Sequence, residues 1–181
     1  CVASAGAILR AGSESQKRAW LPKIASGEAI LTPAWLEPDR GYGPKGVQLR
    51  ARVDGDTVVL DGVKRHVLFA SSAARLVVLA RSGDAPEAID LLLVDPTSPG
   101  VTLVQQRTLG SDCQYQVRFD NVRVPAADRI GGAGSGWATW HDTLLEGIIY
   151  LAAQSAGGAE RALEMTNHYA KIREQFGKPI G

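Results

Sequence analysis

The hydrophobic pattern of this chain changes period near residue 131, and this change limits what the chain can fold into. From Glu28 to about Ile130, apolar residues occur in short runs rich in β-branched side chains, separated by turn-forming residues. From Trp137 to about Arg173 they recur with helical spacing, and no proline intervenes. The first pattern predicts an antiparallel sheet of short strands, and the second predicts one helix of about 35 residues.

About seven strands are expected in the first segment, enough for a small antiparallel β-sandwich or barrel. Asp54-Gly55-Asp56 stands at hairpin distance between two of them, and Asp61-Gly62 indicates a further turn. The expected strands are Ala29–Ala34, Val47–Val53, Thr57–Leu60, Leu76–Ala80, Ile89–Val94, Val101–Gln105 and Tyr115–Phe119.

Helical segments are expected before the sheet. Cys1 to Leu9 is apolar with small residues and has no preceding capping signal, so it is interpreted as the tail of a helix that begins upstream. Ser13 is an N-cap candidate with Gln16 at the capping-box position, and Gly27 is expected to end the second helix. The predicted fold class is therefore an α+β fragment: a small central β-sandwich or barrel, flanked by a short helical segment and one long C-terminal helix. Both ends of the chain are expected to be cut.

Charge and composition exclude several function classes. Lys+Arg number 20 and Asp+Glu 19, a net charge of +1, whereas a nucleic-acid-binding domain normally shows a basic excess. No apolar run approaches the roughly 18 residues of a membrane span. Cys1 and Cys113 are too few for a disulfide framework or a metal cluster, which favours a reducing, cytoplasmic compartment. His66, His141 and His168 lack the spacing of metal ligands, so no metal site is predicted.

A series of short motifs follows in one order along the chain. They are Leu21-Pro22 with Ala25-Ser26-Gly27-Glu28, Glu37-Pro38, Asp54-Gly55-Asp56, Leu60-Asp61-Gly62-Val63-Lys64, Ser98-Pro99-Gly100-Val101, Phe119-Asp120-Asn121-Val122-Arg123-Val124-Pro125, Ala152-Ala153-Gln154 and Arg173-Glu174-Gln175-Phe176-Gly177-Lys178-Pro179-Ile180. Together they resemble the acyl-CoA dehydrogenase family. The match covers essentially the whole chain, and the ordered set is far more specific than any one motif.

The resemblance implies three parts: residues 1–27 as the tail of the N-terminal helical domain, 28–130 as the middle β-domain, and 131–181 as the start of the C-terminal helical bundle. In that family FAD lies between the β-domain and the helices. A glutamate removes the α-proton of an acyl-CoA thioester while a hydride leaves the β-carbon for the flavin. By resemblance the catalytic base lies downstream of residue 181, the substrate is an acyl-CoA, and an electron-transfer flavoprotein is the expected acceptor.

Two stretches depart from the family pattern where the resemblance places the flavin ring. The usual Thr of the Thr-Glu-Pro stretch is Leu36, and Tyr42 replaces a small Ser. The usual Trp-Ile-Thr is His66-Val67-Leu68, which loses an indole and a second hydroxyl. Each buried polar group of the flavin edge that is left without a hydrogen-bond partner weakens flavin binding by about 1–3 kcal/mol. The alternative is a divergent subfamily in which backbone amides near Leu36 still serve.

The long helix also departs from the family pattern. Some members carry the glutamate at the position aligned with Gly147, and Glu146 stands one residue away. One residue is about 100° of helix rotation, so Glu146 is not expected to aim at the same point. We expect Glu146 to be solvated or paired at i,i+4 spacing, with Asp142 four positions back.

Arg173, Gln175 and Phe176 match the family signature at the end of the long helix. In the family this signature reaches across a dimer interface to the diphosphate and adenosine half of the neighbour's FAD, so these three residues are the predicted cofactor-binding residues. A guanidinium suits a diphosphate because it is planar, permanently charged and bidentate. The alternative is an ordinary cationic helix end, favoured by the macrodipole.

Three hypotheses follow. The first is an FAD-dependent acyl-CoA dehydrogenase subunit that assembles with itself or with a sister subunit, this fragment alone being inactive. The second is a catalytically silent partner in a heteromeric enzyme, contributing FAD contacts in trans. The third is a non-enzymatic scaffold.

Overall fold

A computed structural model of the chain describes residues 1–110 and 112–181. Contacts between residues divide it into two compact units, Cys1–Thr143 and Leu144–Gly181. The helices are α1 (Val2–Ala11), α2 (Glu14–Ser26) and α3 (Gly136–Ile172), with short 3-10 turns η1 (Pro44–Gly46), η2 (Ala70–Ser72) and η3 (Ala126–Asp128). The strands are β1 (Leu31–Ala34), β2 (Arg50–Asp54), β3 (Thr57–Leu68), β4 (Arg75–Arg81), β5 (Ile89–Val94), β6 (Val101–Gln106), β7 (Gln114–Pro125), β8 (Arg129–Ile130), β9 (Glu174–Gln175) and β10 (Lys178–Pro179).

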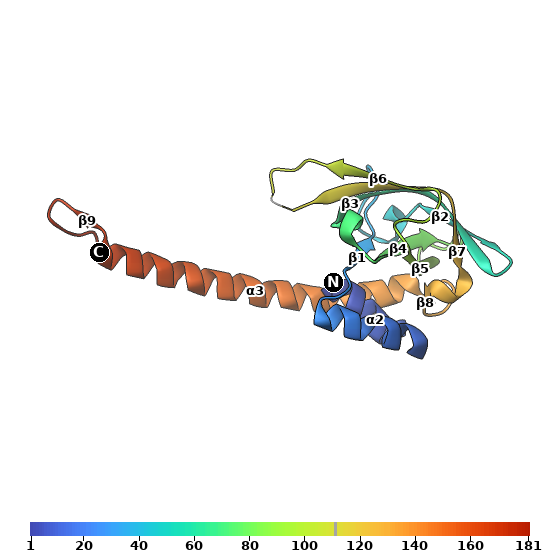
Figure 1. The fold of residues 1–181 in the computed structure, drawn as a ribbon, viewed down its shortest axis with the longest axis horizontal. Coiled ribbons are helices and arrows are strands. Elements are labelled where there is room, and N and C mark those ends of the chain that lie inside the picture. The colour runs from blue at the N-terminus through green and yellow to red at the C-terminus, as the bar shows by residue number, and fades with distance from the viewer. Residues whose placement is uncertain (111) are drawn as a thin grey trace. The chain divides into compact units, whose positions relative to one another are not determined.

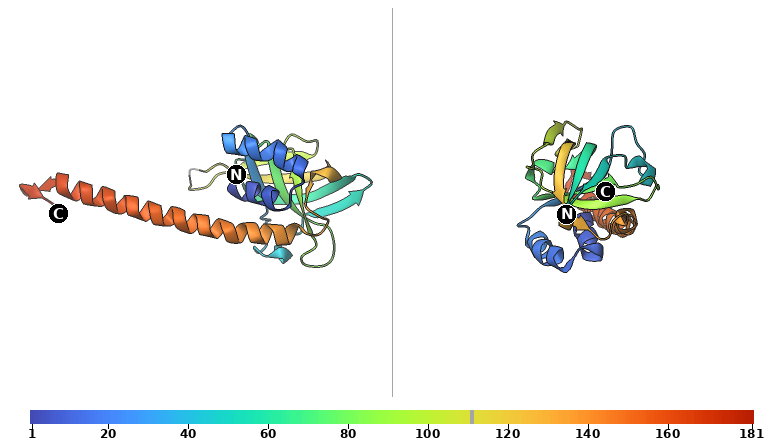
Figure 2. Two further views of the ribbon diagram at one scale, coloured as in Figure 1. Left: turned by 90° about the horizontal axis from the view of Figure 1, so that it is seen from below. Right: turned by 90° about the vertical axis from the view of Figure 1, so that its right-hand side faces the viewer.

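The capping box expected at the start of α2 is confirmed. The Ser13 hydroxyl accepts from the Gln16 backbone N–H over 3.2 Å, and the Gln16 amide oxygen accepts from the Ser13 backbone N–H over 3.0 Å. Gly27 ends the helix with a φ of 79°, as expected. The Gln16 amide also donates to the carbonyls of Ala127 and Arg129, which fastens α2 to η3 and β8. The two N-terminal helices lie side by side (Figure 2).

One eight-stranded sheet forms the centre of the first unit, with the strand order β6-β7-β3-β2-β4-β5-β8 and β1 beside β4 (Figure 1). All seven expected strands form. In the expected β2-β3 hairpin Asp54 pairs with Thr57, which leaves a two-residue loop. Its first residue, Gly55, has a φ of 59°, a conformation that glycine adopts without a Cβ clash.

The sheet is mixed, so the expectation of a wholly antiparallel sheet is corrected. β1 runs parallel to β4, beginning with Leu31 opposite Arg75, and β2 meets β4 in parallel at Arg50 and Arg81. Parallel neighbours need a long connection, and here the chain between β1 and β4 passes through the whole β2-β3 hairpin. Turn signals indicate where strands end, but they do not encode which strands become neighbours.

β3 continues through Asp61-Gly62, where the sequence predicted a turn. The pairing of β3 with β7 shifts register at Gly62, whose φ is 145°, so this pair makes a bulge and the strand goes on. A second shift falls between Lys64 and Val67, where His66 has a φ of 54°. Arg65, His66 and Leu68, in the second half of β3, line the hollow described in the next subsection.

The core lies on the inner face of this sheet. Along β7 its apolar side chains alternate with exposed residues, whereas every residue of β5 is buried, as in a strand that is covered on both faces. The buried set includes Ala34, Leu49, Val58, Leu60, Val67, Leu76, Val78, Leu92, Val94, Val117, Phe119, Val122 and Val124.

Buried Asp90 joins the sheet to the start of α3. Its carboxylate accepts from the Gly134 backbone N–H over 2.6 Å and from the Arg129 guanidinium over 2.9 Å. Gly136 then packs directly on the backbone of β5, since a Cβ there would lie 2.6 Å from the Leu91 nitrogen. The glycine-rich stretch from Gly131 to Gly136 thus brings the helix start against β5.

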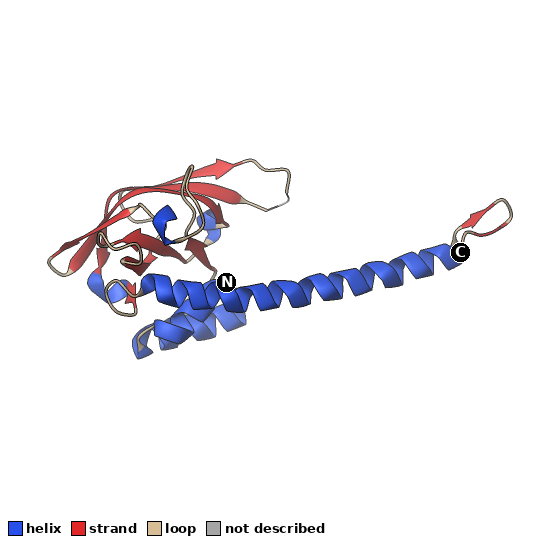
Figure 3. Cartoon of the chain, turned by 180° about the vertical axis from the view of Figure 1, so that it is seen from behind, coloured by secondary structure: helices blue, strands red, loops and turns tan. Residues whose placement is uncertain are grey.

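The second unit begins within α3. The helix runs unbroken for 37 residues, so the long helix expected from Trp137 to about Arg173 is confirmed. Apolar side chains such as Ile148, Leu151 and Met165 are exposed in this unit. A two-stranded hairpin of β9 and β10 follows the helix (Figure 3). None of the helices in the described chain combines the length and apolar composition that crossing a bilayer requires.

Candidate functional site

A small hollow of about 100 Å³ lies where the end of β1 meets the second half of β3. Leu36 and His66, which belong to the two divergent stretches of the sequence, both line it. The Arg65 backbone N–H donates to the Leu36 carbonyl over 2.8 Å and holds the two stretches together. The wall of the hollow combines apolar, aromatic, hydroxyl and cationic groups. They come from Thr32, Pro33, Trp35, Leu36, Arg65, His66 and Leu68.

A buried ion pair stands directly behind this wall. The Lys64 ammonium donates to the Glu37 carboxylate over 2.6 Å, and their side chains are 0% and 6% exposed. The same ammonium donates to the Trp35 carbonyl over 3.1 Å, and the same carboxylate oxygen accepts from the backbone N–H groups of Gln48 and Leu49. The pair therefore ties the loop after β1 to β3 and to the chain entering β2.

Two opposing effects act on the pKa of the Lys64 ammonium. Burial lowers its pKa to about 8, and the Glu37 carboxylate opposes that fall. At neutral pH the ammonium is therefore still charged. A charge without its partner at this depth would be strongly destabilising, so both members of the pair are needed.

His66 is fixed on several sides. Its backbone N–H donates to the Gln106 amide oxygen over 2.9 Å. The Arg65 Nε–H donates to His66 Nε2 over 2.9 Å, so Nε2 must be an acceptor. Nδ1 lies 2.7 Å from the Gln114 amide oxygen and must carry the proton. These contacts specify the neutral imidazole and occupy both ring nitrogens, so only the ring face remains for a ligand.

Tyr42 lies outside the residues that line the hollow. Its ring packs edge-on against Trp35, with centroids 6.0 Å apart, and the Tyr42 side chain is 72% exposed. Trp35 also meets the buried Trp140 edge-on, with centroids 5.5 Å apart. Tyr42, which replaces the small serine of the family pattern, therefore does not form part of the wall of this hollow.

A second, larger and more open hollow of about 490 Å³ lies beside the loop from Asp39 to Gly46. The Arg81 guanidinium fastens this loop to the turn before β5. Its N–H groups donate to the carbonyls of Pro44 and Val47 on one side and of Ala85 on the other. The loop also folds tightly on itself, because Gly46 packs against the Gly41 carbonyl.

We expect Gly46→Ala to lower the free energy of unfolding by about 1–3 kcal/mol, because the added Cβ would overlap the Gly41 carbonyl. Gly43→Ala, in the same loop, is the matched control: a Cβ at Gly43 meets nothing within 4 Å, and we expect a change within about 0.5 kcal/mol. Urea unfolding followed by circular dichroism measures both. Equal losses in the two variants would contradict the close packing.

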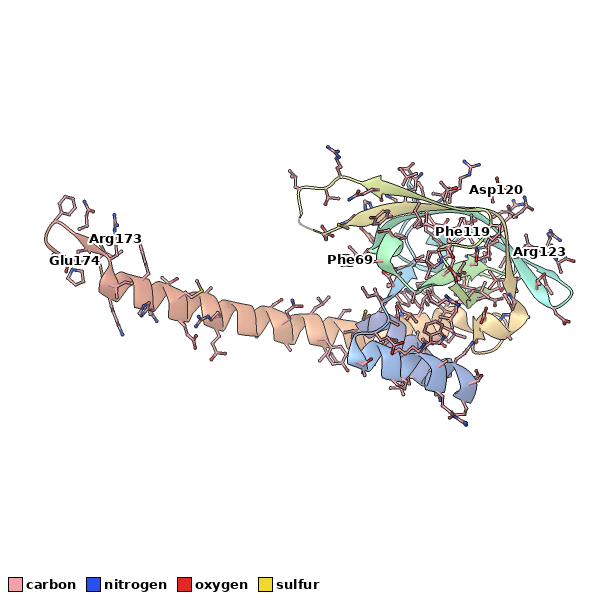
Figure 4. All side chains as sticks on the ribbon, viewed as in Figure 1. Phe69, Phe119, Asp120, Arg123, Arg173 and Glu174 are labelled. Carbon is pink, nitrogen blue, oxygen red and sulfur yellow. The ribbon has the colours of Figure 1, made fainter. Side chains whose placement is uncertain are left out.

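Arg173, Gln175 and Phe176 lie in the second unit. Arg173 follows the last residue of α3 (Figure 4), and Gln175 and Phe176 belong to the hairpin after it. The Arg173 backbone N–H still bonds the Tyr169 carbonyl over 2.9 Å, and the hairpin starts at the next residue. Phe176 and Gly177 form its two-residue turn with φ values of 54° and 78°. A positive φ is unusual for an aromatic residue, and here it leaves the Phe176 side chain 93% exposed.

The structure gives Glu146 a hydrogen-bond partner on its own helix. Its carboxylate accepts from the Tyr150 hydroxyl over 2.6 Å, four residues ahead. An i,i+4 pairing of Glu146, as expected, is therefore present with Tyr150. Among the described residues, no group of three or more histidine, cysteine or acidic side chains could hold a metal ion.

Two family models match most of this chain. Residues 33–122 match "Acyl-CoA dehydrogenase, middle domain", and residues 134–181 match "Acyl-CoA dehydrogenase, C-terminal domain". The chain belongs to the acyl-CoA dehydrogenase family. The resemblance found in the sequence motifs is therefore confirmed, and so is the α+β fold class, with its sheet now described as mixed.

Individual acyl-CoA dehydrogenases agree with this assignment. The probable acyl-CoA dehydrogenase YngJ of Bacillus subtilis is 35% identical over 93% of this chain and 46% of its own length. The glutaryl-coenzyme A dehydrogenase glutaryl-CoA complex superposes with a TM-score of 0.92 at 29% identity, over 99% of this chain and 47% of that one. The Mycobacterium smegmatis glutaryl-CoA dehydrogenase in complex with FADH2 gives 0.83 at 34% identity, over 98% and 46%. The chain thus spans about half the length of its relatives.

Two further solved structures are similar to this chain. The ChsE4-ChsE5 complex from Mycobacterium tuberculosis matches at 27% identity with a TM-score of 0.72, over 78% of this chain and 37% of that one. A structure described as the electron transferring flavoprotein of Acidaminococcus fermentans matches at 30% identity with a TM-score of 0.88, over 97% and 48%.

Sequence reasoning missed the roles of Glu37, Lys64 and Arg65. Glu37 and Lys64 lie within motifs that carried the family resemblance, but no role was assigned to either. A signal was present for Lys64, because it follows Leu60 and Gly62 at the alternating positions of an inward-facing strand. A lysine at such a position needs a buried acidic partner.

Proposed function

We propose that this chain is part of an FAD-dependent acyl-CoA dehydrogenase that introduces a double bond between the α and β carbons of an acyl-CoA thioester. The observation that carries the proposal is the meeting of two divergent stretches, around Leu36 and around His66, at one hollow held by the Arg65–Leu36 backbone bond. When bound, FAD supplies the acceptor for the hydride that leaves the β-carbon.

The residues of the hollow fit one face of a flavin ring. Trp35, Leu36 and the face of His66 offer apolar and aromatic surface, while Thr32 and Arg65 offer polar groups at its edge. The hydroxyls that the family usually provides are leucines at positions 36 and 68. Backbone groups would have to make the hydrogen bonds of these two hydroxyls. We therefore propose that the flavin pocket is present in a divergent form.

We further propose that Arg173, Gln175 and Phe176 contact the diphosphate and adenosine part of FAD in a second copy of the chain or in a sister subunit. The two-residue hairpin turn supports this, because it leaves the Phe176 side chain exposed three residues after Arg173. A permanently charged, bidentate guanidinium matches a diphosphate. The catalytic base is proposed to lie beyond residue 181.

The proposed partners are an acyl-CoA substrate, a second dehydrogenase subunit, and an electron-transfer flavoprotein as acceptor. The likeness to chains from the ChsE4-ChsE5 complex and from the flavoprotein structure supports the last two. The free and exposed Cys1 and Cys113 support a reducing, cytoplasmic compartment. A silent subunit or a scaffold is not favoured, because the relatives and neighbours named above are dehydrogenases.

The proposal is tested by expressing the full-length protein alone and together with candidate sister chains encoded nearby. We expect yellow protein with flavin absorbance and acyl-CoA-dependent bleaching when the chain is expressed alone. Colour only on co-expression would instead point to the silent-subunit hypothesis. Colourless protein in every pairing, even after incubation with excess FAD, would contradict the proposed function.

A further inference from the structure

Arg65 places a cation on the wall of the hollow without an acidic partner. Its only side-chain hydrogen bond among the described residues runs to His66 Nε2 over 2.9 Å, and no ion pair of Arg65 occurs in that part of the chain. Two other arginines of the sheet have acidic partners. Arg75 pairs with Asp95 over 3.0 Å and Arg129 with Asp90 over 2.9 Å. The charge of the Arg65 guanidinium is thus not balanced by an acidic partner among the described residues, and its two terminal amino groups make no described hydrogen bond.

The structure also fixes where this cation lies. The His66 imidazole that accepts from Arg65 is itself held by Gln114, and the Gln114 amide donates to Asp112 over 2.7 Å. The series of hydrogen bonds Asp112–Gln114–His66–Arg65 therefore orients the guanidinium, and no carboxylate of the described residues bonds it.

Nearby charge does not cancel that of Arg65. Behind the wall, Lys64 and Glu37 form their own pair and neutralise each other. Asp112, the acid at the far end of the chain, is separated from Arg65 by two uncharged side chains. The wall facing the hollow therefore carries a net positive charge.

A simple charge balance shows what such a wall favours. Transfer of a hydride to a neutral flavin ring adds one negative charge to the ring, because the hydride brings two electrons with one proton. A fixed cation at the wall attracts the reduced ring more strongly than the oxidised ring, and it needs no rearrangement to do so.

We infer that the Arg65 charge raises the midpoint potential of a flavin bound in the hollow, because it stabilises the reduced, anionic flavin ring relative to the oxidised ring. The inference rests on the proposed function. It assigns to Arg65, together with the His66 that orients it, a role that does not require contact with the substrate.

The test compares flavin midpoint potentials, measured by equilibration with redox dyes in the full-length FAD-loaded protein. Arg65→Gln removes the charge and keeps a polar side chain of similar length. We expect the preference for reduced over oxidised flavin to fall at least tenfold, which for a two-electron couple lowers the potential by about 30 mV. Arg65→Lys keeps the charge and should retain most of the preference.

Two further variants complete the design. Arg52→Gln makes the same change of charge on β2, at an exposed position outside the hollow, and should leave the potential unchanged. His66→Phe keeps a planar ring but removes the acceptor that orients Arg65, and should lower the potential in the same direction. It also provides an independent test if Arg65→Gln does not fold.

The outcomes separate this inference from the proposed function. Wild-type protein that binds no flavin overturns both. Flavin bound with an unchanged potential in Arg65→Gln and His66→Phe overturns the inference alone. An equal loss in Arg65→Lys and Arg65→Gln also overturns it, since the shape of the side chain and not its charge would then be responsible.

Discussion

Lys64→Met is expected to lower the free energy of unfolding by about 3–5 kcal/mol, because it leaves the Glu37 carboxylate buried without its counter-ion. The loss also removes the donor to the Trp35 carbonyl, which forms part of the wall of the hollow. Urea unfolding of the purified protein, followed by circular dichroism, measures the effect. Lys17→Met is the matched control, since the exposed Lys17–Glu14 pair contributes at most about 1 kcal/mol.

A loss below about 1 kcal/mol in Lys64→Met would contradict the structural role of the pair. The double variant Lys64→Met with Glu37→Leu tests the reason for the loss. Replacing both charges removes the uncompensated carboxylate, so stability should partly recover. Recovery should be incomplete, because the backbone N–H groups of Gln48 and Leu49 then lose their acceptor.

Arg173→Ala is expected to weaken FAD binding by about 10- to 150-fold, while leaving the unfolding midpoint of the FAD-free protein nearly unchanged. A hydrogen bond to a charged group contributes about 1.5–3 kcal/mol, and that energy sets the range. The Arg173 side chain has no described partner in this chain, so its removal should cost little folding stability. Fluorescence titration of the assembled full-length protein with FAD gives the dissociation constant.

Lys171→Ala is the control for Arg173→Ala. Lys171 is also a cation in the last turn of α3, and it lies outside the three predicted cofactor-binding residues. If an ordinary cationic helix end explained Arg173, the two variants would have the same small effect. FAD retention in Arg173→Ala equal to the wild type would remove the trans contact from the account.

Local sequence signals predicted most of the elements. Ser13 and Gln16 specify the start of α2 by themselves, and Gly27 specifies its end, because caps are formed by neighbours in sequence. The same signals failed at Asp61-Gly62, where pairing with β7 turned a turn-forming pair into a bulge. They also could not show that β1 runs parallel to β4, since strand pairing depends on residues far apart in the chain.

The site was predicted in part. The family resemblance singled out Leu36 and His66, and the structure brings them to one hollow. It did not reveal that Gln106 of β6 and Gln114 of β7 hold His66, because these contacts join residues far apart in the chain. The contact of Arg173 with a cofactor stays a prediction, as do the domain boundaries at residues 27 and 130.

A crystal structure of the full-length protein with FAD tests the central claim most directly. The account predicts the flavin ring in van der Waals contact with Leu36 and the face of His66, with the Arg65 guanidinium at its edge. A ring bound at another place on the sheet, or a hollow filled by protein side chains while FAD lies elsewhere, would contradict it.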